Sequence, residues 1–178
     1  MNGIASLLDK PATSRVENLW QELEVHCGLV GVKSTPFPHL TWQVTEGYGL
    51  PRLEAALHAL ADQVCRFTIH ASGIGLFVGE NPIVYISIIK DEPLLLFHSL
   101  LWERLNGIAF HPVLYYSPGQ WVPHITMAYN DVTSTNLDCV MQFLAFQSLD
   151  LKIEIDNLIL VIQGEDQLPA TVRYPFGH

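Results

Sequence analysis

Two short segments of this 178-residue chain carry the same run of residue types. Residues 38–42 read Pro-His-Leu-Thr-Trp, and residues 123–127 read Pro-His-Ile-Thr-Met. Histidine has an ordinary pKa of about 6.5, so it can accept or donate a proton near neutral pH. The threonine hydroxyl can donate a hydrogen bond to an anionic oxygen. Two copies of the segment could therefore supply the acid, the base and the anion-binding groups of one reaction.

These segments have the residue types of strands, in which successive side chains point to opposite faces. His39 and Thr41 then share one face, and His124 and Thr126 share one face in the same way. Two such strands related by an approximate twofold axis would place all four side chains around one cleft. There, one histidine could take a proton from the attacking water and the other could protonate the leaving oxygen of a phosphodiester. The hydroxyls could bind the non-bridging oxygens, so we expect neither a metal nor an organic cofactor.

A chain of this length with two His-x-Thr motifs roughly 85 residues apart resembles the two-histidine phosphoesterase superfamily. That superfamily includes the bacterial 2′-5′ RNA ligase-like proteins and cyclic nucleotide phosphodiesterases. The resemblance implies hydrolysis of 2′,3′-cyclic phosphates or related phosphodiesters of nucleotides or RNA ends, or the reverse reaction. It implies that His39 and His124 share the acid and base roles and that Thr41 and Thr126 bind the phosphate.

The resemblance also implies an α+β fold that is bilobal and pseudo-twofold. Two mainly antiparallel sheets would flank a central cleft, with helices on the outside, and residues 1–178 would form a single domain of two intertwined lobes. Apolar residues at helical spacing predict helices over residues 11–27, 51–64, 93–106 and 134–146. Apolar and β-branched runs predict strands over residues 3–8, 37–44, 67–72, 75–78, 83–89, 121–129, 151–162 and 171–176. This order suggests a duplicated unit, with each half centred on one motif strand.

The charge of the chain limits the kind of substrate. The net charge is −9, with only nine Lys plus Arg residues, and no cation lies between Arg104 and Lys152. Binding to long DNA or RNA needs clustered cations that neutralise phosphates. We therefore expect a small nucleotide or an RNA end as the partner, and no long duplex nucleic acid.

Aromatic residues close to the two motifs could stack on a nucleobase. The candidates are Phe37, Trp121 and Tyr129, with Tyr115 and Tyr116 in the loop before the second motif. Core packing or loop anchoring is the more common role for such side chains.

Three alternatives use the same residues. A non-catalytic module could hold a nucleotide or RNA end in the same cleft, and the sequence does not separate it from an enzyme. A 2′-5′ RNA ligase is disfavoured by the acidic charge. A metal site built from His39, His124 and a carboxylate lacks any supporting His-Glu-x-x-His or Asp/His cluster.

The remaining features concern compartment and core. Cys27, Cys65 and Cys139 are odd in number and form no Cys-x-x-Cys pair, so we expect three reduced thiols. No apolar run approaches the roughly 20 residues that span a bilayer, and the first residues do not read as a signal peptide. We therefore expect a cytoplasmic protein with no membrane partner. His58 and His98 fall on predicted helices, where we expect them at the surface or its boundary.

Overall fold

The computed structural model describes residues 2–35, 37–162 and 170–177. Its four α-helices lie within a few residues of the predicted ranges: α1 (Lys10–Cys27), α2 (Leu50–Gln63), α3 (Glu92–Leu105) and α4 (Leu137–Ala145). Two short 3₁₀ helices, which the sequence did not predict, are η1 (Gly31–Ser34) and η2 (Leu114–Tyr116).

Aspartate side chains begin two of the helices. The Asp9 carboxylate accepts a hydrogen bond from the backbone N–H of Ala12 at 2.9 Å, and Asp91 accepts one from Leu94 at 3.1 Å. Both satisfy a backbone donor of the first turn, which has no partner inside the helix. Asp9 also accepts a hydrogen bond from the backbone N–H of Glu154 at 2.8 Å, so the cap of α1 is tied to a strand.

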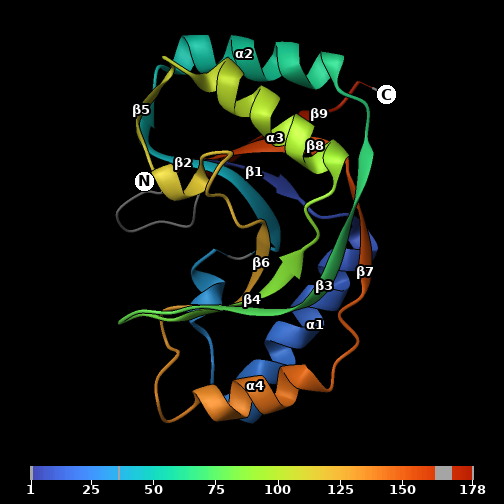
Figure 1. The fold of residues 1–178 in the computed structure, drawn as a ribbon, viewed down its shortest axis with the longest axis vertical. Coiled ribbons are helices and arrows are strands. Elements are labelled where there is room, and N and C mark those ends of the chain that lie inside the picture. The colour runs from blue at the N-terminus through green and yellow to red at the C-terminus, as the bar shows by residue number, and fades with distance from the viewer. Residues whose placement is uncertain (1, 36, 163–169, 178) are drawn as a thin grey trace.

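The strands form two antiparallel sheets (Figure 1). One sheet has the order β5-β2-β1-β8-β9, and the other has the order β6-β4-β3-β7. The bounds are β1 (Asn2–Leu7), β2 (His39–Tyr48), β3 (Phe67–Phe77), β4 (Ile83–Ile88), β5 (Ala109–Pro112), β6 (His124–Ala128), β7 (Leu151–Ile155), β8 (Asn157–Ile162) and β9 (Ala170–Pro175).

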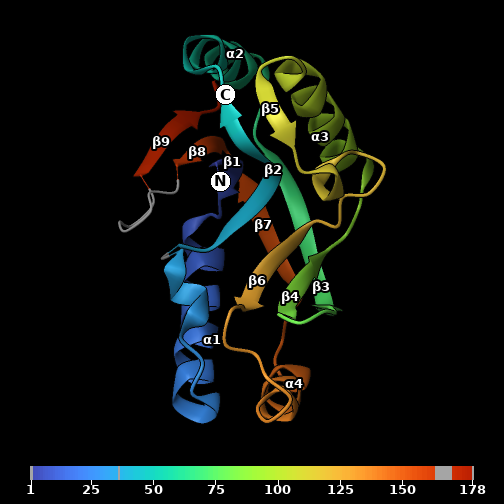
Figure 2. The ribbon, with the colours of Figure 1, turned by 90° about the vertical axis from the view of Figure 1, so that its left-hand side faces the viewer.

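Each sheet is covered by two helices, which gives two lobes (Figures 1 and 2). The five-stranded lobe is the first sheet with α2 and α3, which contact β2, β8 and β9. The four-stranded lobe is the second sheet with α1 and α4, of which α1 contacts β6 and β7. Between the lobes, β2 contacts β6, so the two motif strands meet across the sheets (Figure 2).

This architecture confirms the predicted α+β class with two antiparallel sheets. The lobes do not coincide with the two halves of the sequence, however, because each sheet takes strands from both halves. The predicted strand over 151–162 is divided after Ile155 between the two sheets, whereas the predicted strands over 67–72 and 75–78 are one strand with a bulge. The sequence did not predict β5.

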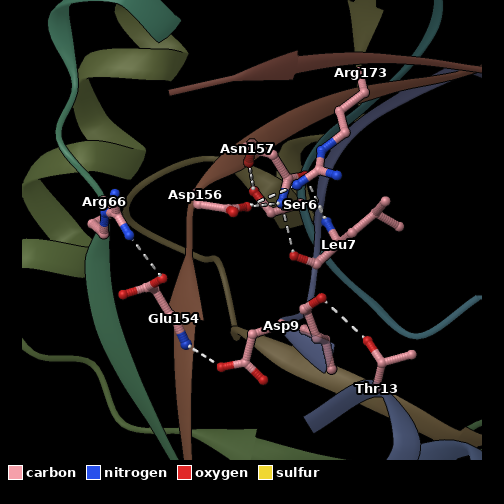
Figure 3. Close-up of polar contacts among 10 residues, drawn as sticks. Ser6, Leu7, Asp9, Thr13, Arg66, Glu154, Asp156, Asn157 and Arg173 are labelled. Carbon is pink, nitrogen blue, oxygen red and sulfur yellow. Dashed lines mark hydrogen bonds and ion pairs between the residues drawn. The ribbon is translucent and has the colours of Figure 1, made fainter. Parts of the chain in front are cut away.

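A polar network marks the point where the chain leaves one lobe for the other (Figure 3). The side chain of Asn157 bonds both the N–H and the carbonyl of Leu7, at 3.0 and 3.1 Å. The Ser6 hydroxyl donates to the carbonyl of Asn157 at 2.5 Å and accepts from the indole N–H of Trp42 at 2.7 Å. These buried polar groups are paired, as burial requires. They connect the junction of β7 and β8 to the strand that carries the first motif.

The core contains the apolar residues of both motif strands. Leu40 and Trp42 of β2 are fully buried, and so are Ile125 and Met127 of β6. The alternation predicted from the sequence is therefore present in both strands: the apolar side chains face the core and the polar ones face the other way.

Two cysteines correct the sequence prediction of three reduced thiols. Cys27 at the end of α1 and Cys139 in α4 form a disulfide, and Cys65 is free and exposed. The pairing follows from the packing of α1 against α4, which brings together residues 112 positions apart in the sequence. Among the described residues, no helix combines the length and the hydrophobicity needed to cross a membrane.

Candidate active site

His39 is the first residue of β2, which lies between β1 and β5 in the five-stranded sheet. Its Nδ1 atom lies 2.9 Å from the carbonyl oxygen of Phe37. A carbonyl can only accept a hydrogen bond, so Nδ1 carries the hydrogen. In the neutral ring, Nε2 is therefore unprotonated. This tautomer can accept a proton at Nε2 and so act as a base.

His124 is the first residue of β6, the edge strand that pairs with β4 in the four-stranded sheet. Its Nδ1 atom lies 2.7 Å from the carbonyl oxygen of Val122. The partner is again the carbonyl two residues earlier in the chain, so this ring has the same tautomer as His39. Both imidazoles are thus oriented by their own strand, independently of any ligand.

One cavity of about 210 Å³ between the lobes brings the four motif side chains together. His39 and Thr41 line it from β2, and His124 and Thr126 line it from β6. The other lining residues are Trp20, Val32, Ser34, Thr35, Ile83, Tyr116 and Tyr129. None of these described lining residues is Lys, Arg, Asp or Glu, so the polar character of the cavity comes from imidazole and hydroxyl groups.

Two tryptophans hold the backbone of the motif threonines in matching ways. The indole N–H of Trp121 donates to the carbonyl of Thr41 at 3.0 Å, and that of Trp20 donates to the carbonyl of Thr126 at 3.0 Å. Trp121 precedes β6 and bonds β2, so its hydrogen bond joins the two lobes beside the cavity. Trp20 comes from α1 and bonds β6 within one lobe.

Burial sets the protonation of the two histidines. It lowers the pKa of His39 below its ordinary value, and the carbonyl of Phe37 partly opposes this. Burial also lowers the pKa of His124; the carbonyl of Val122 opposes this, and the charge of His39 lowers the pKa further. The two rings therefore titrate as a pair, in which one positive charge disfavours the second.

The wall of the cavity beside His39 is fixed by a carboxylate. Asp131 accepts hydrogen bonds from the backbone N–H groups of Val30 and Gly31, both at 2.6 Å. A side chain at Gly31 would lie 2.0 Å from the carbonyl oxygen of Tyr129, so only glycine fits this close approach. The contact anchors η1, which contributes Val32 to the cavity, against the residues that follow β6.

Trp121 was predicted as a candidate for stacking on a nucleobase, but in the structure it is buried. It is only 1% exposed, and its ring packs on the ring of His98 with centroids 3.9 Å apart. Little of the indole is therefore exposed, although Trp121 is among the residues that line a cavity beside His124. Its structural role is the hydrogen bond to Thr41 across the lobes.

The other stacking candidates have different positions. Tyr129 and Tyr116 line the central cavity. Phe37 packs edge-on against the ring of His39, with centroids 5.6 Å apart, and it is not among the lining residues of that cavity. Tyr115 is 79% exposed. Tyr129 and Tyr116 are thus the candidates that the structure brings to the motif side chains.

Sequence reasoning missed several residues near the site. His98 was expected at the surface or its boundary, but it is fully buried, and its Nε2 atom bonds the carbonyl of Trp42 at 3.0 Å. Phe77 of β3 packs edge-on against His124, with centroids 5.0 Å apart. Trp20 lies within the helix predicted over residues 11–27 and was not singled out there. No local pattern marks these residues, because each depends on how distant elements pack.

The described residues include no group of three or more His, Cys, Asp or Glu side chains placed to hold a metal ion. The donor set at the cavity consists of two imidazoles and several hydroxyls, whose direct chemistry is proton transfer and hydrogen bonding.

Two sheets that each contribute one His-x-Thr strand to a shared cavity define the class of this protein as a bilobal α+β protein of the two-histidine type. The family model of the 2′-5′ RNA ligase superfamily matches residues 11–167, and the chain belongs to this superfamily. The resemblance inferred from the two motifs is thereby confirmed. Among curated protein sequences, none matches the chain significantly.

Three solved structures show the same fold over nearly the whole chain. The crystal structure of TT0787 of Thermus thermophilus has a TM-score of 0.62 at 18% identity, covering 99% of this chain and 97% of that one. E. coli LigT complexed with NADP+ has a TM-score of 0.56 at 13% identity, covering 99% and 97%. Kluyveromyces marxianus Usb1 with uridine monophosphate has a TM-score of 0.53 at 10% identity, covering 98% of both chains.

Proposed function

We propose that this protein is a phosphodiesterase that opens 2′,3′-cyclic phosphates, or related phosphodiesters, of nucleotides or RNA ends. The observation that carries the proposal is that His39, Thr41, His124 and Thr126 line one cavity, with a motif from each lobe. Both imidazoles are held through Nδ1 by a backbone carbonyl, which leaves both Nε2 atoms for proton transfer.

Paired histidines suit in-line displacement at phosphorus. One neutral imidazole takes a proton from water as the oxygen attacks, and the other, protonated, imidazole gives a proton to the departing oxygen. The coupling of the two pKa values favours a pair that carries a single proton, which is the form this chemistry requires.

The threonines supply hydrogen-bond donors for the phosphate. The hydroxyls of Thr41 and Thr126 have no hydrogen-bond partner among the described residues, and both residues line the cavity. Donors placed in advance around a non-bridging oxygen stabilise the charge that this oxygen carries in the transition state. The acid, the base and these donors together cover the needs of the reaction.

A nucleotide substrate agrees with the relatives and with the charge of the chain. A structure of LigT holds NADP+, and one of Usb1 holds uridine monophosphate. A net charge of −9 and the lack of Lys or Arg among the described lining residues favour a small substrate over a long nucleic acid.

Turnover of a panel of 2′,3′-cyclic nucleotides, with and without EDTA, tests the proposal. We expect hydrolysis to a nucleoside monophosphate, at a rate that EDTA does not lower. His124→Ala should lower kcat by about 10²–10⁴-fold, because one proton-transfer group is lost. His70→Ala is the matched control, since His70 is an exposed residue of β3 outside the cavity and should leave kcat unchanged.

Other outcomes separate the alternatives. Binding without turnover would identify a nucleotide-binding module, and inhibition by EDTA would identify a metal enzyme. Joining of RNA ends in the absence of hydrolysis would identify a ligase. Full activity of His124→Ala on every hydrolysed substrate would refute the paired-histidine mechanism.

A further inference from the structure

A second, larger cavity opens on the His124 side of the central one. Its volume is about 560 Å³, and it shares Ile83, Tyr116 and His124 with the central cavity. Its other walls are the end of β3 and the residues just after it (76–78), and the loop over residues 115–122. We call it the aromatic pocket.

The aromatic pocket has the chemistry of a site for a flat, uncharged ring. Its described lining residues include no Lys, Arg, Asp or Glu, and its polar side chains besides His124 are two tyrosines and Gln120. Phe77 contributes a ring that already packs edge-on against His124 and is stacked on Tyr85, with centroids 4.3 Å apart. An aromatic ligand could stack here without having to order a mobile side chain.

The loop that forms the outer wall is held in place by hydrogen bonds. The backbone N–H of Val113 donates to the carbonyl of Val44 in β2 at 2.8 Å, and that of Trp121 donates to the carbonyl of Ser117 at 2.8 Å. The Ser117 hydroxyl donates to the carbonyl of Leu114 at 2.7 Å. The pocket is therefore built between β3 of one lobe and a loop anchored on β2 of the other.

The His39 side of the site differs from this. The adjoining cavity there has a volume of about 120 Å³ and is lined by small or aliphatic residues such as Gly3, Ala5 and Val161, with Asn2 and Thr35. Pockets for organic ligands usually measure roughly 300–1,000 Å³, so this cavity is too small for a nucleoside. It has room for several waters, each of which takes about 30 Å³.

We propose that the aromatic pocket holds the nucleobase of the substrate, which places the ribose on the His124 side of the phosphate and the attacking water on the His39 side. This inference rests on the proposed function and adds to it a direction for the reaction. In a 2′,3′-cyclic phosphate, the leaving oxygen belongs to the same ribose as the base. His124 is then the acid and His39 is the base.

Two protons and two bonds to phosphorus change in this step. Nε2 of His39 takes a proton from water, and the water oxygen bonds to phosphorus. The bond from phosphorus to one ribose oxygen breaks, and that oxygen receives the proton held on Nε2 of His124. The product is a nucleoside monophosphate, and proton exchange with solvent restores the pair. A singly protonated pair can hold its proton on either ring, and the reactive form holds it on His124.

The first test compares substrates with and without a base. We measure kcat/KM for adenosine 2′,3′-cyclic phosphate and for methyl ribofuranoside 2,3-cyclic phosphate, which lacks the base. Tyr115→Ala removes an exposed ring of the pocket, and Val78→Trp fills it from a position that is 85% exposed, so neither change threatens the fold. Each should lower the ratio of the two values about tenfold, since one stacked base contributes about that much.

Phe110→Ala is the matched control, because Phe110 is a half-exposed aromatic residue of β5 outside all three cavities. It should leave the ratio unchanged. A ratio that also stays unchanged in both pocket variants would overturn the inference. If no cyclic phosphate is hydrolysed, the proposed function and the acid and base assignment both fail. Calorimetric binding of adenosine 3′-monophosphate and of methyl ribofuranoside 3-phosphate then decides whether the pocket takes the base.

The second test separates the two histidines with bis(4-nitrophenyl) phosphate, whose leaving group departs without needing a proton. One nitrophenyl ring would occupy the aromatic pocket in place of the base. His124→Ala should then keep most of the wild-type rate on this diester while losing turnover of the cyclic nucleotide. His39→Ala should lose both. The opposite pattern would overturn the assignment of the acid and the base.

Discussion

The two motif strands are alike in how they hold their functional groups and different in what surrounds them. In both, the histidine Nδ1 atom bonds the carbonyl two residues earlier, and a tryptophan N–H bonds the carbonyl of the threonine. Yet β2 lies inside its sheet and β6 lies at an edge. Next to His39 is a cavity of about 120 Å³, whereas next to His124 is one of about 560 Å³.

This contrast locates the asymmetry of a site whose two motif strands are otherwise alike. The proposed acid–base pair needs matched geometry, which the histidine bond to a nearby carbonyl and the tryptophan bond to the threonine carbonyl provide in each half. The proposed direction of the reaction needs an asymmetry, and the two flanking cavities differ in this way, since the aromatic pocket lies beside His124 and a much smaller cavity lies beside His39. The predictions below test how far the two halves are equivalent, beginning with the largest effect.

The hydroxyls of Thr41 and Thr126 test most directly whether the two halves of the site are equivalent. Thr41→Val and Thr126→Val each remove one donor to the phosphate, so each should lower kcat by about 10²–10³-fold. Thr41→Ser and Thr126→Ser keep the hydroxyl and should keep most of the activity. Steady-state kinetics on a cyclic nucleotide measure both effects. A valine variant with the wild-type kcat would show that its half of the site does not bind the phosphate.

Among the described residues one imidazole is fully buried, that of His98, which bonds the carbonyl of Trp42 in β2, so acid should weaken this part of the core. Burial, opposed by the carbonyl of Trp42, lowers the pKa of His98 to about 4 from the ordinary 6.5. Between these values the unfolded chain binds more protons than the folded one, so the free energy of unfolding falls as the pH drops from 6.5 to about 4. A pKa shift of this size corresponds to a change of roughly 3 kcal/mol in the free energy of unfolding.

Urea unfolding at a series of pH values measures this loss. His98→Gln should be less stable than the wild type at pH 7, and its stability should fall less steeply toward acid. An unchanged dependence on pH in His98→Gln would show that another group governs the acid sensitivity.

Substituting Trp121 and Trp20 compares a hydrogen bond between the lobes with a hydrogen bond within one lobe. Trp121→Phe and Trp20→Phe each leave a threonine carbonyl unpaired, which costs about 1–3 kcal/mol of stability. Of these two tryptophans, Trp121 is the one whose hydrogen bond joins the lobes. Trp121→Phe should therefore also lower kcat about tenfold, because small displacements of reacting groups slow catalysis. Trp20→Phe should change kcat less. Denaturant unfolding and steady-state kinetics together decide, and equal kinetic losses would contradict the distinction.

The smallest effect concerns the mutual titration of the pair. The charge of His39 lowers the pKa of His124, so His39→Asn should raise the pKa of His124 measured by NMR. In the wild type, burial lowers both pKa values, so the bell-shaped profile of kcat/KM should have its maximum on the acid side of 6.5. A pKa of His124 that is unaffected by His39→Asn would mean that the two rings do not interact.

Local sequence patterns predicted the helices, the direction of the motif side chains and the family. The alternation of polar and apolar residues around His39 and His124 placed the right side chains toward the core, because a strand fixes the direction of each side chain from its position alone. The approximate bounds of the helices followed from apolar spacing. The family followed from the motif pair, which occurs in a recognisable order and spacing.

Features that depend on distant packing could not be predicted in the same way. Nothing in the run over 151–162 shows that the chain changes sheets after Ile155, because that depends on partners in β3 and β1. The pairing of Cys27 with Cys139 requires that α1 meets α4. The burial of Trp121 and the placement of Phe77 beside His124 also arise only when the two lobes come together.

The order of strands has a consequence for how the protein is made. The first of the described strands in chain order, β1, lies in its sheet between β2 and β8, while every described strand and helix of the four-stranded lobe precedes β8. The lobe that carries His124 can thus be complete while the lobe that carries His39 still lacks its last two strands. During synthesis, the edge of β1 that pairs with β8 therefore stays unpaired until β8 has emerged, and the five-stranded lobe can be completed only after that.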